Sequence, residues 1–335
     1  MRRPARRPAM RRQRGVAVVT ALLLTTLAVS IVASLFWQQQ VQVRSMENQR
    51  LQLQTKWIQR GALEWLSVLL RQSNYTVSYT ALDQPWATPL AETRLDQFVD
   101  RERIEGENFE ASLSGNIIDA TSRYNLTNLA KNGIPDPDQL LIFNRLLNNL
   151  RMDGRLAQRV SQMVAAGQPP QEVPAEGQEG NPTPTPTPPR PAQEGIVGMP
   201  APVLRVDDLM SVQGFTPELL QKLRAFVIVL PEPTPVNVNT APAEVLAAVL
   251  PGYSLSEANV IVEKRKRAPW RDIAQFQSEL KPGTQTVPDS ISVESKYFLV
   301  QSRIRLDRAA LNAESLISRA GIVGGGTKVV WTRQN

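Results

Sequence analysis

The sequence contains no cysteine and no histidine among its 335 residues. Without cysteine the chain has no disulfide bonds, thiolate metal sites or cysteine nucleophiles, and without histidine most hydrolytic triads and transition-metal sites cannot be assembled. The chemistry that remains is carboxylate catalysis, or the binding of a hard cation such as calcium by oxygen ligands. These absences argue against an enzyme.

Apart from residues 1–15, the chain also has no excess of charge of either sign. The chain has 38 basic and 31 acidic residues, which gives a formal net charge of +7. Residues 1–15 contain seven arginines and no acid, so the remainder carries 31 basic against 31 acidic residues. A neutral chain gives no electrostatic indication of a polyanionic partner, and we expect no nucleic acid.

Charged residues are absent from the run between Val16 and Trp37. As a helix, these 22 residues span about 33 Å, which is close to the thickness of the hydrocarbon core of a bilayer. The arginine-rich segment before the run favours retention of that end in the cytoplasm. We therefore expect a single transmembrane helix over residues 16–37, with the rest of the chain across the membrane.

The small-residue cleavage site of a secretory signal peptide is not found after this run, where Ser34-Leu35-Phe36-Trp37 follows. A lone Gly15 instead separates the basic leader from the apolar run. That junction resembles the leader of type IV pilins and pseudopilins, which is cleaved on the cytoplasmic side just after the glycine. Residues 1–15 are therefore expected to be a cleaved leader. The alternative is an uncleaved signal anchor in which Gly15 is accidental.

Helix-breaking residues are absent from Gln38 to Arg60, which contains neither proline nor glycine. A single helix is therefore predicted from about residue 16 to residue 71, half in lipid and half docked on a globular domain. A loop rich in turn residues follows over 73–89. The apolar positions predicted to form the docking face are Trp57, Ile58, Ala62, Trp65, Leu66 and Leu69.

Alternating apolar and polar residues predict strands on both sides of a helical block. The first strand lies near residues 109–118, and three more are predicted at 298–306, 311–319 and 327–332. The sequence therefore predicts an α+β fold, in which a pilin-like long N-terminal helix packs on a small antiparallel sheet and an all-α lobe is inserted. The expected boundaries are 38–124 and 286–335 for the two parts of the pilin-like domain and 125–285 for the inserted domain.

The central block has the apolar spacing and capping residues of short helices. Residues 118–129 have helical composition, and Val236–Glu244 is predicted to cap the helix that follows it. Residues 168–202 contain a Pro-Thr repeat with little apolar surface, so we predict a disordered linker there. Helices are predicted at 136–150, 154–166, 219–230, 244–250, 256–267 and 273–280.

The turn at residues 250–254 (Leu-Pro-Gly-Tyr-Ser) and the helix behind it resemble a helix-hairpin-helix, or SAM-like, element. In nucleic-acid-binding versions, a second glycine lets backbone N–H groups approach a phosphate, and Ser254 stands in that place here. The basic cluster Lys264–Arg267 also suits the C-terminal end of a helix dipole. We interpret the element as structural. A membrane-tethered nucleic-acid-binding protein is the alternative.

Two acidic groups offer the oxygen ligands that calcium prefers. Neither has the regular spacing of a calcium-binding loop, so we interpret their side chains as exposed and solvated, and calcium stays open as a cofactor. The groups are Asp96, Asp100, Glu102, Glu105 and Glu107, and Asp136 with Asp138.

Four segments together resemble the general secretion pathway protein K family, the minor pseudopilins of the type II secretion system. The resemblance extends over nearly the whole chain except the Pro-Thr linker. The segments are the Gly15-Val16 junction, residues 123–129 (Arg-Tyr-Asn-Leu-Thr-Asn-Leu), residues 236–241 (Val-Asn-Val-Asn-Thr-Ala) and the terminal strand at Tyr297-Phe298-Leu299.

The resemblance implies a non-enzymatic subunit at the tip of the pseudopilus, which assists protein export across the outer membrane. It implies cleavage after Gly15 by prepilin peptidase, methylation of Val16, and a single-pass location in the inner membrane with the C-terminal part in the periplasm. The implied partners are the I- and J-type minor pseudopilins, prepilin peptidase and the inner-membrane secretion platform.

Thr20 occupies the fifth position after the expected cleavage site, where ordinary pilins carry glutamate. A carboxylate in lipid is costly unless it is paired, and in pilins it is thought to meet the terminal amine of a neighbouring subunit. A subunit without this carboxylate fits the tip of the fibre. A minor type IV pilin of an adhesion or uptake pilus is the alternative from the same class.

Overall fold

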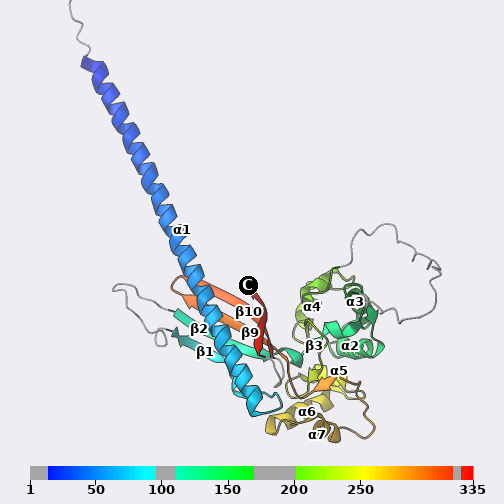
Figure 1. Ribbon diagram of the computed structural model, residues 1–335. Coiled ribbons are helices and arrows are strands. Elements are labelled where there is room, and N and C mark those ends of the chain that lie inside the picture. Colours follow the sequence, from blue (N-terminus) through cyan, green and yellow to red (C-terminus); the bar gives the residue numbers. More distant parts are fainter. Residues whose placement is uncertain (1–13, 96–110, 170–200, 320–325, 335) are drawn as a thin grey trace, which may run out of the picture.

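The structure is a computed structural model that describes residues 14–95, 111–169, 201–319 and 326–334. A long helix, α1 (Arg14–Thr76), projects far beyond a body made of a sheet and a helical lobe (Figure 1). Its 63 residues correspond to about 95 Å of helix at 1.5 Å per residue. The observed helix includes the range predicted from the sequence and extends five residues further, to Thr76.

Five antiparallel strands form the sheet on which the second half of α1 lies, in the order β1-β2-β9-β10-β11. The strands β9 and β10 form a hairpin, and Asp307 in its turn has the left-handed φ of 51°. The neighbours β2 and β9 are far apart in sequence, with Ile118 opposite Leu299. The strands are β1 (Leu90–Arg94), β2 (Ala111–Asp119), β9 (Tyr297–Leu306), β10 (Ala309–Arg319) and β11 (Thr327–Gln334).

The two faces of the sheet have different neighbours, because successive side chains of a strand point to opposite sides. Phe298, Val300 and Ile317 pack against Leu63 and Leu70 of α1 and against Trp86. The opposite face of the sheet packs against the helical lobe. There the packed residues include Leu299, Leu316, Ile228, Leu230 and the partly buried Trp331.

The chain between β2 and β9 forms the helical lobe, which has its own large apolar core. Figure 1 shows this lobe beside the sheet, on the side away from α1. Its helices are α2 (Pro137–Asn149), α3 (Arg155–Ala166), α4 (Pro217–Leu223), α5 (Ala243–Val249), α6 (Leu255–Arg267) and α7 (Ile273–Ser278). Its short strands are β3 (Tyr124–Asn125), β4 (Ala130–Lys131), β5 (Ile134–Pro135), β6 (Val227–Ile228), β7 (Val236–Asn237) and β8 (Ile291–Ser292). The 3₁₀ turns between β2 and β9 are η3 (Ala120–Ser122), η4 (Leu126–Leu129) and η5 (Val206–Ser211). A further 3₁₀ turn, η1 (Pro85–Ala87), lies between α1 and β1.

The α+β class, the long helix on an antiparallel sheet and the helical lobe are confirmed. The three terminal strands occupy the predicted positions, and the helices at 136–150 and 154–166 are present as α2 and α3. The strand β1 was not predicted, because Leu90–Arg94 is short and mostly exposed and so lacks a buried alternation.

Residues 118–129 do not form the helix that their composition indicated. Asp119 and Asn125 each accept a hydrogen bond from a backbone N–H two residues later, at 2.9 Å and 3.1 Å respectively. These side-chain bonds stabilise tight 3₁₀ turns in competition with a helix. A two-residue strand, β3, separates the turns.

Two further helix predictions in the lobe were wrong in detail. The helix predicted at 219–230 ends at Leu223, because Val227–Ile228 pairs in parallel with Tyr124–Asn125. The helix α5 has Pro242 at its N-cap and no side-chain cap, so the segment Val236–Glu244 does not supply one. Its asparagines instead bind other parts of the chain.

Three sets of predictions fall wholly or mainly outside the described residues. They are the leader before Arg14, the acidic group from Asp96 to Glu107, and most of the linker predicted at 168–202. All of them stay predictions. The domain boundaries at 124–125 and 285–286 also stay predictions.

Candidate functional site

The first part of α1 exposes its apolar side chains along the whole length expected to lie in a membrane. Every residue from Val16 to Trp37 is exposed. Among the described residues, α1 is the one helix that is long and apolar enough to cross a membrane. It therefore fits a transmembrane anchor.

The three threonine hydroxyl groups in this segment are bonded within the helix itself. Thr20 Oγ1 lies 3.0 Å from the carbonyl oxygens of Val16 and Ala17. Thr25 and Thr26 donate to the carbonyls of the residues three positions earlier, at 2.9 Å and 3.0 Å. Each of these threonine hydroxyls is thus satisfied without water, as the interior of a bilayer requires. Position 20 carries no charge and needs no partner in lipid.

The second part of α1 turns one face to the sheet and leaves the other exposed. The buried positions Thr55, Gln59, Leu63 and Leu70 follow a spacing of four or seven residues. The predicted docking face was partly wrong, because Trp57 and Trp65 were assigned to it and are 67% and 57% exposed. Of the other residues assigned to it, Leu66 and Leu69 do pack against the buried cluster.

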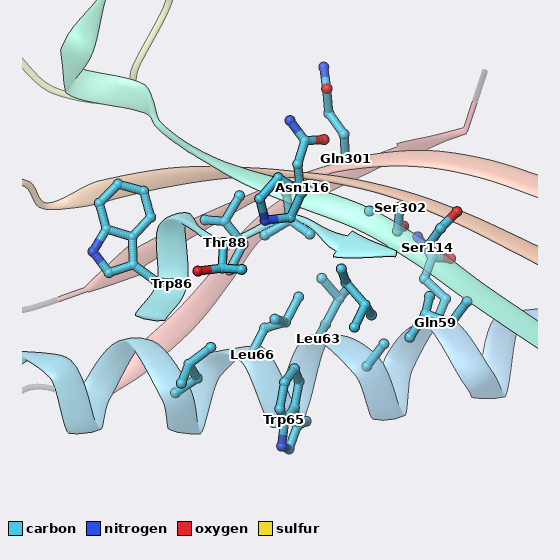
Figure 2. A pocket seen from close by; sticks show the side chains of 18 of the residues that line it. Gln59, Leu63, Trp65, Leu66, Trp86, Thr88, Ser114, Asn116, Gln301 and Ser302 are labelled. Carbon is cyan, nitrogen blue, oxygen red and sulfur yellow. The ribbon is translucent and has the colours of Figure 1, made fainter. Parts of the chain in front are cut away.

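An apolar groove of about 170 Å³ runs between α1 and the strands β1, β2 and β9. Figure 2 shows Leu63 and Leu66 of α1 facing the sheet, with Trp65 on the outer side of the helix in that view. Within the described residues, Gln59 Nε2 is buried here without a hydrogen-bond partner. Trp65 also lines this groove. We call the groove, together with the exposed side chains of Trp57 and Trp65, the stem surface.

A buried carboxylate joins the sheet to the lobe. Asp119, at the end of β2, is 2% exposed. Its Oδ2 accepts hydrogen bonds from Thr240 Oγ1 at 2.5 Å, Ser295 Oγ at 2.6 Å and Asn237 Nδ2 at 3.0 Å. Its Oδ1 accepts from the backbone N–H of Thr121 at 2.9 Å. Hydrogen bonds to a charged acceptor are stronger than neutral ones, so this cluster fixes where the lobe leaves the sheet.

Arg319 connects the same junction to the end of α1. Its Nη2 donates to Thr80 Oγ1 at 2.6 Å and to the carbonyl of Ser295 at 2.9 Å, and its Nη1 donates to Ser73 Oγ at 3.2 Å. The guanidinium also lies 4.7 Å from the centre of the Phe298 ring. Burial lowers the pKa of Arg319, and the negative charges of Asp119 and Glu294 oppose that shift. The stem helix, sheet and lobe therefore meet at one rigid polar junction.

No motif in the sequence predicted this junction. Asn237 and Thr240 lie in the segment that carried the family resemblance, but their role was taken to be helix capping. Asp119 and Arg319 each lie at the end of a strand, where a charged residue is normally solvated. The sequence feature that could have indicated the junction is the position of Asp119, an acid that directly follows the apolar residues Ile117 and Ile118.

The helix-hairpin-helix turn is present between α5 and α6, with Gly252 at a φ of 77°. Ser254 forms a capping box with Glu257. Arg265 is buried and donates to the carbonyls of Val238 at 2.8 Å and Ala241 at 2.5 Å, and burial lowers its pKa to about 10.

Two other members of the basic cluster are also engaged by protein groups. Lys264 pairs with Glu279 at 3.3 Å and Lys266 with Glu263 at 2.5 Å. The arrangement supports the structural interpretation of this element, because these cations already have protein partners.

Of the candidate calcium ligands, the described part of the chain contains Asp136 and Asp138. Asp136 caps α2 by accepting from the backbone N–H groups of Asp138 and Gln139. Across the described ranges, no three acidic side chains come together as a metal site would require. Calcium binding by the group from Asp96 to Glu107 stays a prediction.

Comparison with known proteins identifies the family. Two family models, both described as type II secretion system (T2SS), protein K, match residues 122–232 and 236–294. The type II secretion system protein K of Pseudomonas aeruginosa is 31% identical over 321 residues, which cover 89% of this chain and 86% of that protein. The Klebsiella pneumoniae protein of the same name is 27% identical, over 92% of this chain and 94% of its own length.

A solved structure has the same fold. It is the GspK-GspI-GspJ complex from the enterotoxigenic Escherichia coli type 2 secretion system, in which one chain superposes with a TM-score of 0.63 at 19% identity. The match covers 87% of this chain and 99% of that chain. With the relative at 31% identity and the two family models, it follows that this chain belongs to the type II secretion system protein K family.

Proposed function

We propose that this chain is a minor pseudopilin that occupies the tip of the pseudopilus and assists protein export across the outer membrane. The observation that carries the proposal is the exposure of apolar side chains along α1, from Val16 through Trp65, while its last turns are fixed to the body. A helix with an apolar first part and a partly exposed second part suits a membrane before assembly and a bundle of similar helices afterwards.

The proposed partners are the I- and J-type minor pseudopilins. The solved relative is a complex of GspK with GspI and GspJ, and the stem surface of this chain offers exposed tryptophans beside an apolar groove. Aromatic side chains of this kind supply much of the energy of protein interfaces. Prepilin peptidase and the inner-membrane secretion platform would act on the membrane segment.

The proposed processing site is the bond after Gly15, which leaves Val16 as the methylated N-terminus. Thr20 is then the fifth residue and cannot neutralise the amine of another subunit. The absence of that carboxylate and the bulk of the lobe both favour the tip over the shaft. The membrane segment would span the inner membrane once, with the sheet and lobe in the periplasm.

We also propose that residues 125–285 form a domain inserted into the pilin-like domain. The pairing of β2 with β9 and the separate core of the lobe support this division. The proposed role is structural and non-enzymatic, since the carboxylate best enclosed by protein, Asp119, is bound to its neighbours.

The test is N-terminal sequencing of the full-length chain from membranes of cells with and without prepilin peptidase. We expect Val16 as the first residue when the peptidase is present and Met1 when it is absent. Gly15→Leu, which fills the space after the basic leader, should retain Met1 in both strains. Retention of Met1 by the parent chain in both strains would contradict the proposal.

A further inference from the structure

A polar cleft of about 410 Å³ lies between the lobe and the sheet face that is turned away from α1. One wall is formed by strands β9, β10 and β11, and the other by η5, the end of α4 and β6. We call it the arginine cleft. Its charged residues are Arg123, Arg205, Arg224, Arg333, Asp207 and Glu314.

Four arginines from four separate segments meet in this cleft, and two acids line it. Asp207 pairs with Arg224. Glu314 accepts a hydrogen bond from Gln301 Nε2 at 3.1 Å. In the part of the chain that the structure describes, no carboxylate accepts from the guanidinium of Arg123 or Arg205, although the backbone N–H of Arg205 donates to Asp208 Oδ2 at 2.9 Å. The cleft therefore has an excess of positive charge.

Two of these arginines are partly buried, so part of the water that would solvate their charge is missing. Burial lowers the pKa of Arg123, and Glu314 is the charge that opposes the shift. Burial also lowers the pKa of Arg333, and the positive charge of Arg205 lowers it further, while Glu314, Asp208 and Asp207 oppose the shift. Like charges held this close are relieved by an anion placed between them.

The shape of the cleft suits a peptide rather than a single small ion. Its apolar lining includes Val227, Val229, Leu299 and Trp331. The guanidinium of Arg333 lies 4.0 Å from the centre of the Trp331 ring and also donates to the carbonyl of Leu204 at 3.1 Å, so it is held in place.

We propose that the arginine cleft binds an extended acidic segment of a partner protein, with its carboxylates received by Arg123, Arg205 and Arg333. The apolar lining would take the side chains between the acids. The inference goes beyond the proposed tip function, because it requires neither cleavage after Gly15 nor a particular residue at position 20.

The experiment is fluorescence anisotropy with the full-length chain in detergent micelles and labelled ten-residue peptides that alternate acidic and apolar residues. The matched peptide has Asn and Gln in place of Asp and Glu. We expect the acidic peptide to bind at least about tenfold more tightly than its neutral match at low salt, and its affinity to fall as salt screens the charges.

Arg205→Gln tests the site without disturbing a buried group, because Arg205 is exposed. It should weaken binding of the acidic peptide several-fold, and Arg205→Glu should weaken it further while allowing a matched basic peptide to bind. The control is Arg308→Gln, an arginine at the β9–β10 turn that pairs with Glu47 of α1 and lies outside the cleft. It should leave binding unchanged.

Two results would overturn the inference. One is equal binding of the acidic and neutral peptides, or acidic binding that Arg205→Glu does not reduce. The other is displacement of the peptide by inorganic phosphate, together with an affinity of the ten-residue acidic peptide that is no higher than the affinity of phosphate alone. That second outcome would make the cleft a site for a small anion only.

Discussion

Asp119 is an acidic residue at a position that is almost completely buried. Its carboxylate receives donors from β2's own turn, from the segment after β7 and from the segment before β9, so three distant stretches of chain converge on it. Arg319 extends the cluster to α1 without touching Asp119 directly. A buried charge of this kind contributes to stability only while its partners are all in place.

Replacement of Asp119 by alanine should therefore be strongly destabilising. It leaves the donors of Asn237, Thr240 and Ser295 buried without their acceptor, and we expect a loss of about 3 kcal/mol in the free energy of unfolding. Denaturant unfolding of the full-length chain in micelles measures it. Asp83→Ala, at an exposed position, is the control and should change stability by less than about 0.5 kcal/mol. Equal effects of the two variants would show that the junction adds no stability.

The folding stability of the lobe depends on pH through Glu257. Its hydrogen bonds with Lys281 and then with Ser254 lower its pKa from 4.5 to about 2. Because the folded pKa is depressed, the stabilisation is complete above pH 4.5 and is lost as the pH falls towards 2.

Glu257→Gln should accordingly lower the denaturation midpoint at pH 7, with the difference from the parent chain shrinking as the pH falls through this range. Lys281→Met removes the main partner and should reproduce that pattern. Circular dichroism during denaturant titration at several pH values gives the measurement. A difference that stays constant from pH 7 to pH 2.5 would refute the assignment.

At the scale of elements, α1 combines two environments in one helix. Its first part has apolar residues all round, as a membrane span requires, and its second part buries one narrow face on the sheet. The sequence predicted the length of the helix well, since nothing in Gln38–Arg60 breaks it. It did not predict which face docks, because Trp57 and Trp65 are as apolar as Leu63 and Leu66.

Trp65→Ala should weaken assembly with I- and J-type pseudopilins without unfolding the chain, because the side chain is 57% exposed. Tryptophan is enriched among the few interface residues whose truncation costs more than about 1 kcal/mol, so we expect a several-fold lower yield in co-purification of the full-length proteins. Leu141→Ala, on an exposed apolar residue of α2, is the control and should have no effect. Unchanged yields with Trp65→Ala would exclude the stem surface from the interface.

At the scale of the whole molecule, a pilin-like body carries a lobe larger than the sheet beside which it lies. The lobe enters and leaves the sheet between β2 and β9, at the polar junction, so the two parts are held together at one end. The arginine cleft lies along the same boundary. Figure 1 shows the lobe at the end of the molecule opposite to the first part of α1.

Thr20→Glu tests the place of the subunit in the fibre. At the tip the new carboxylate would have no terminal amine to pair with, and an unpaired acid in lipid costs about 2.5–3.5 kcal/mol. We expect reduced secretion with Thr20→Glu and normal secretion with Thr20→Val, which has the same shape as the parent residue and no charge. Immunogold labelling of the parent chain should mark fibre ends. Normal secretion with Thr20→Glu, together with label along the shafts, would contradict the tip position.

Local pattern alone determined the long helix, the terminal strands, the amphipathic helices α2 and α3, and the neutral surface, because each depends on periodicity or composition within a short window. Tertiary structure decided the rest. The stretch at 118–129 became turns because Asp119 and Asn125 bind backbone groups and distant donors, and residues 227–228 became a strand because Tyr124–Asn125 lies beside them. The polar junction and the arginine cleft gather residues separated by a hundred positions or more, and the pairing of β2 with β9 brings them together.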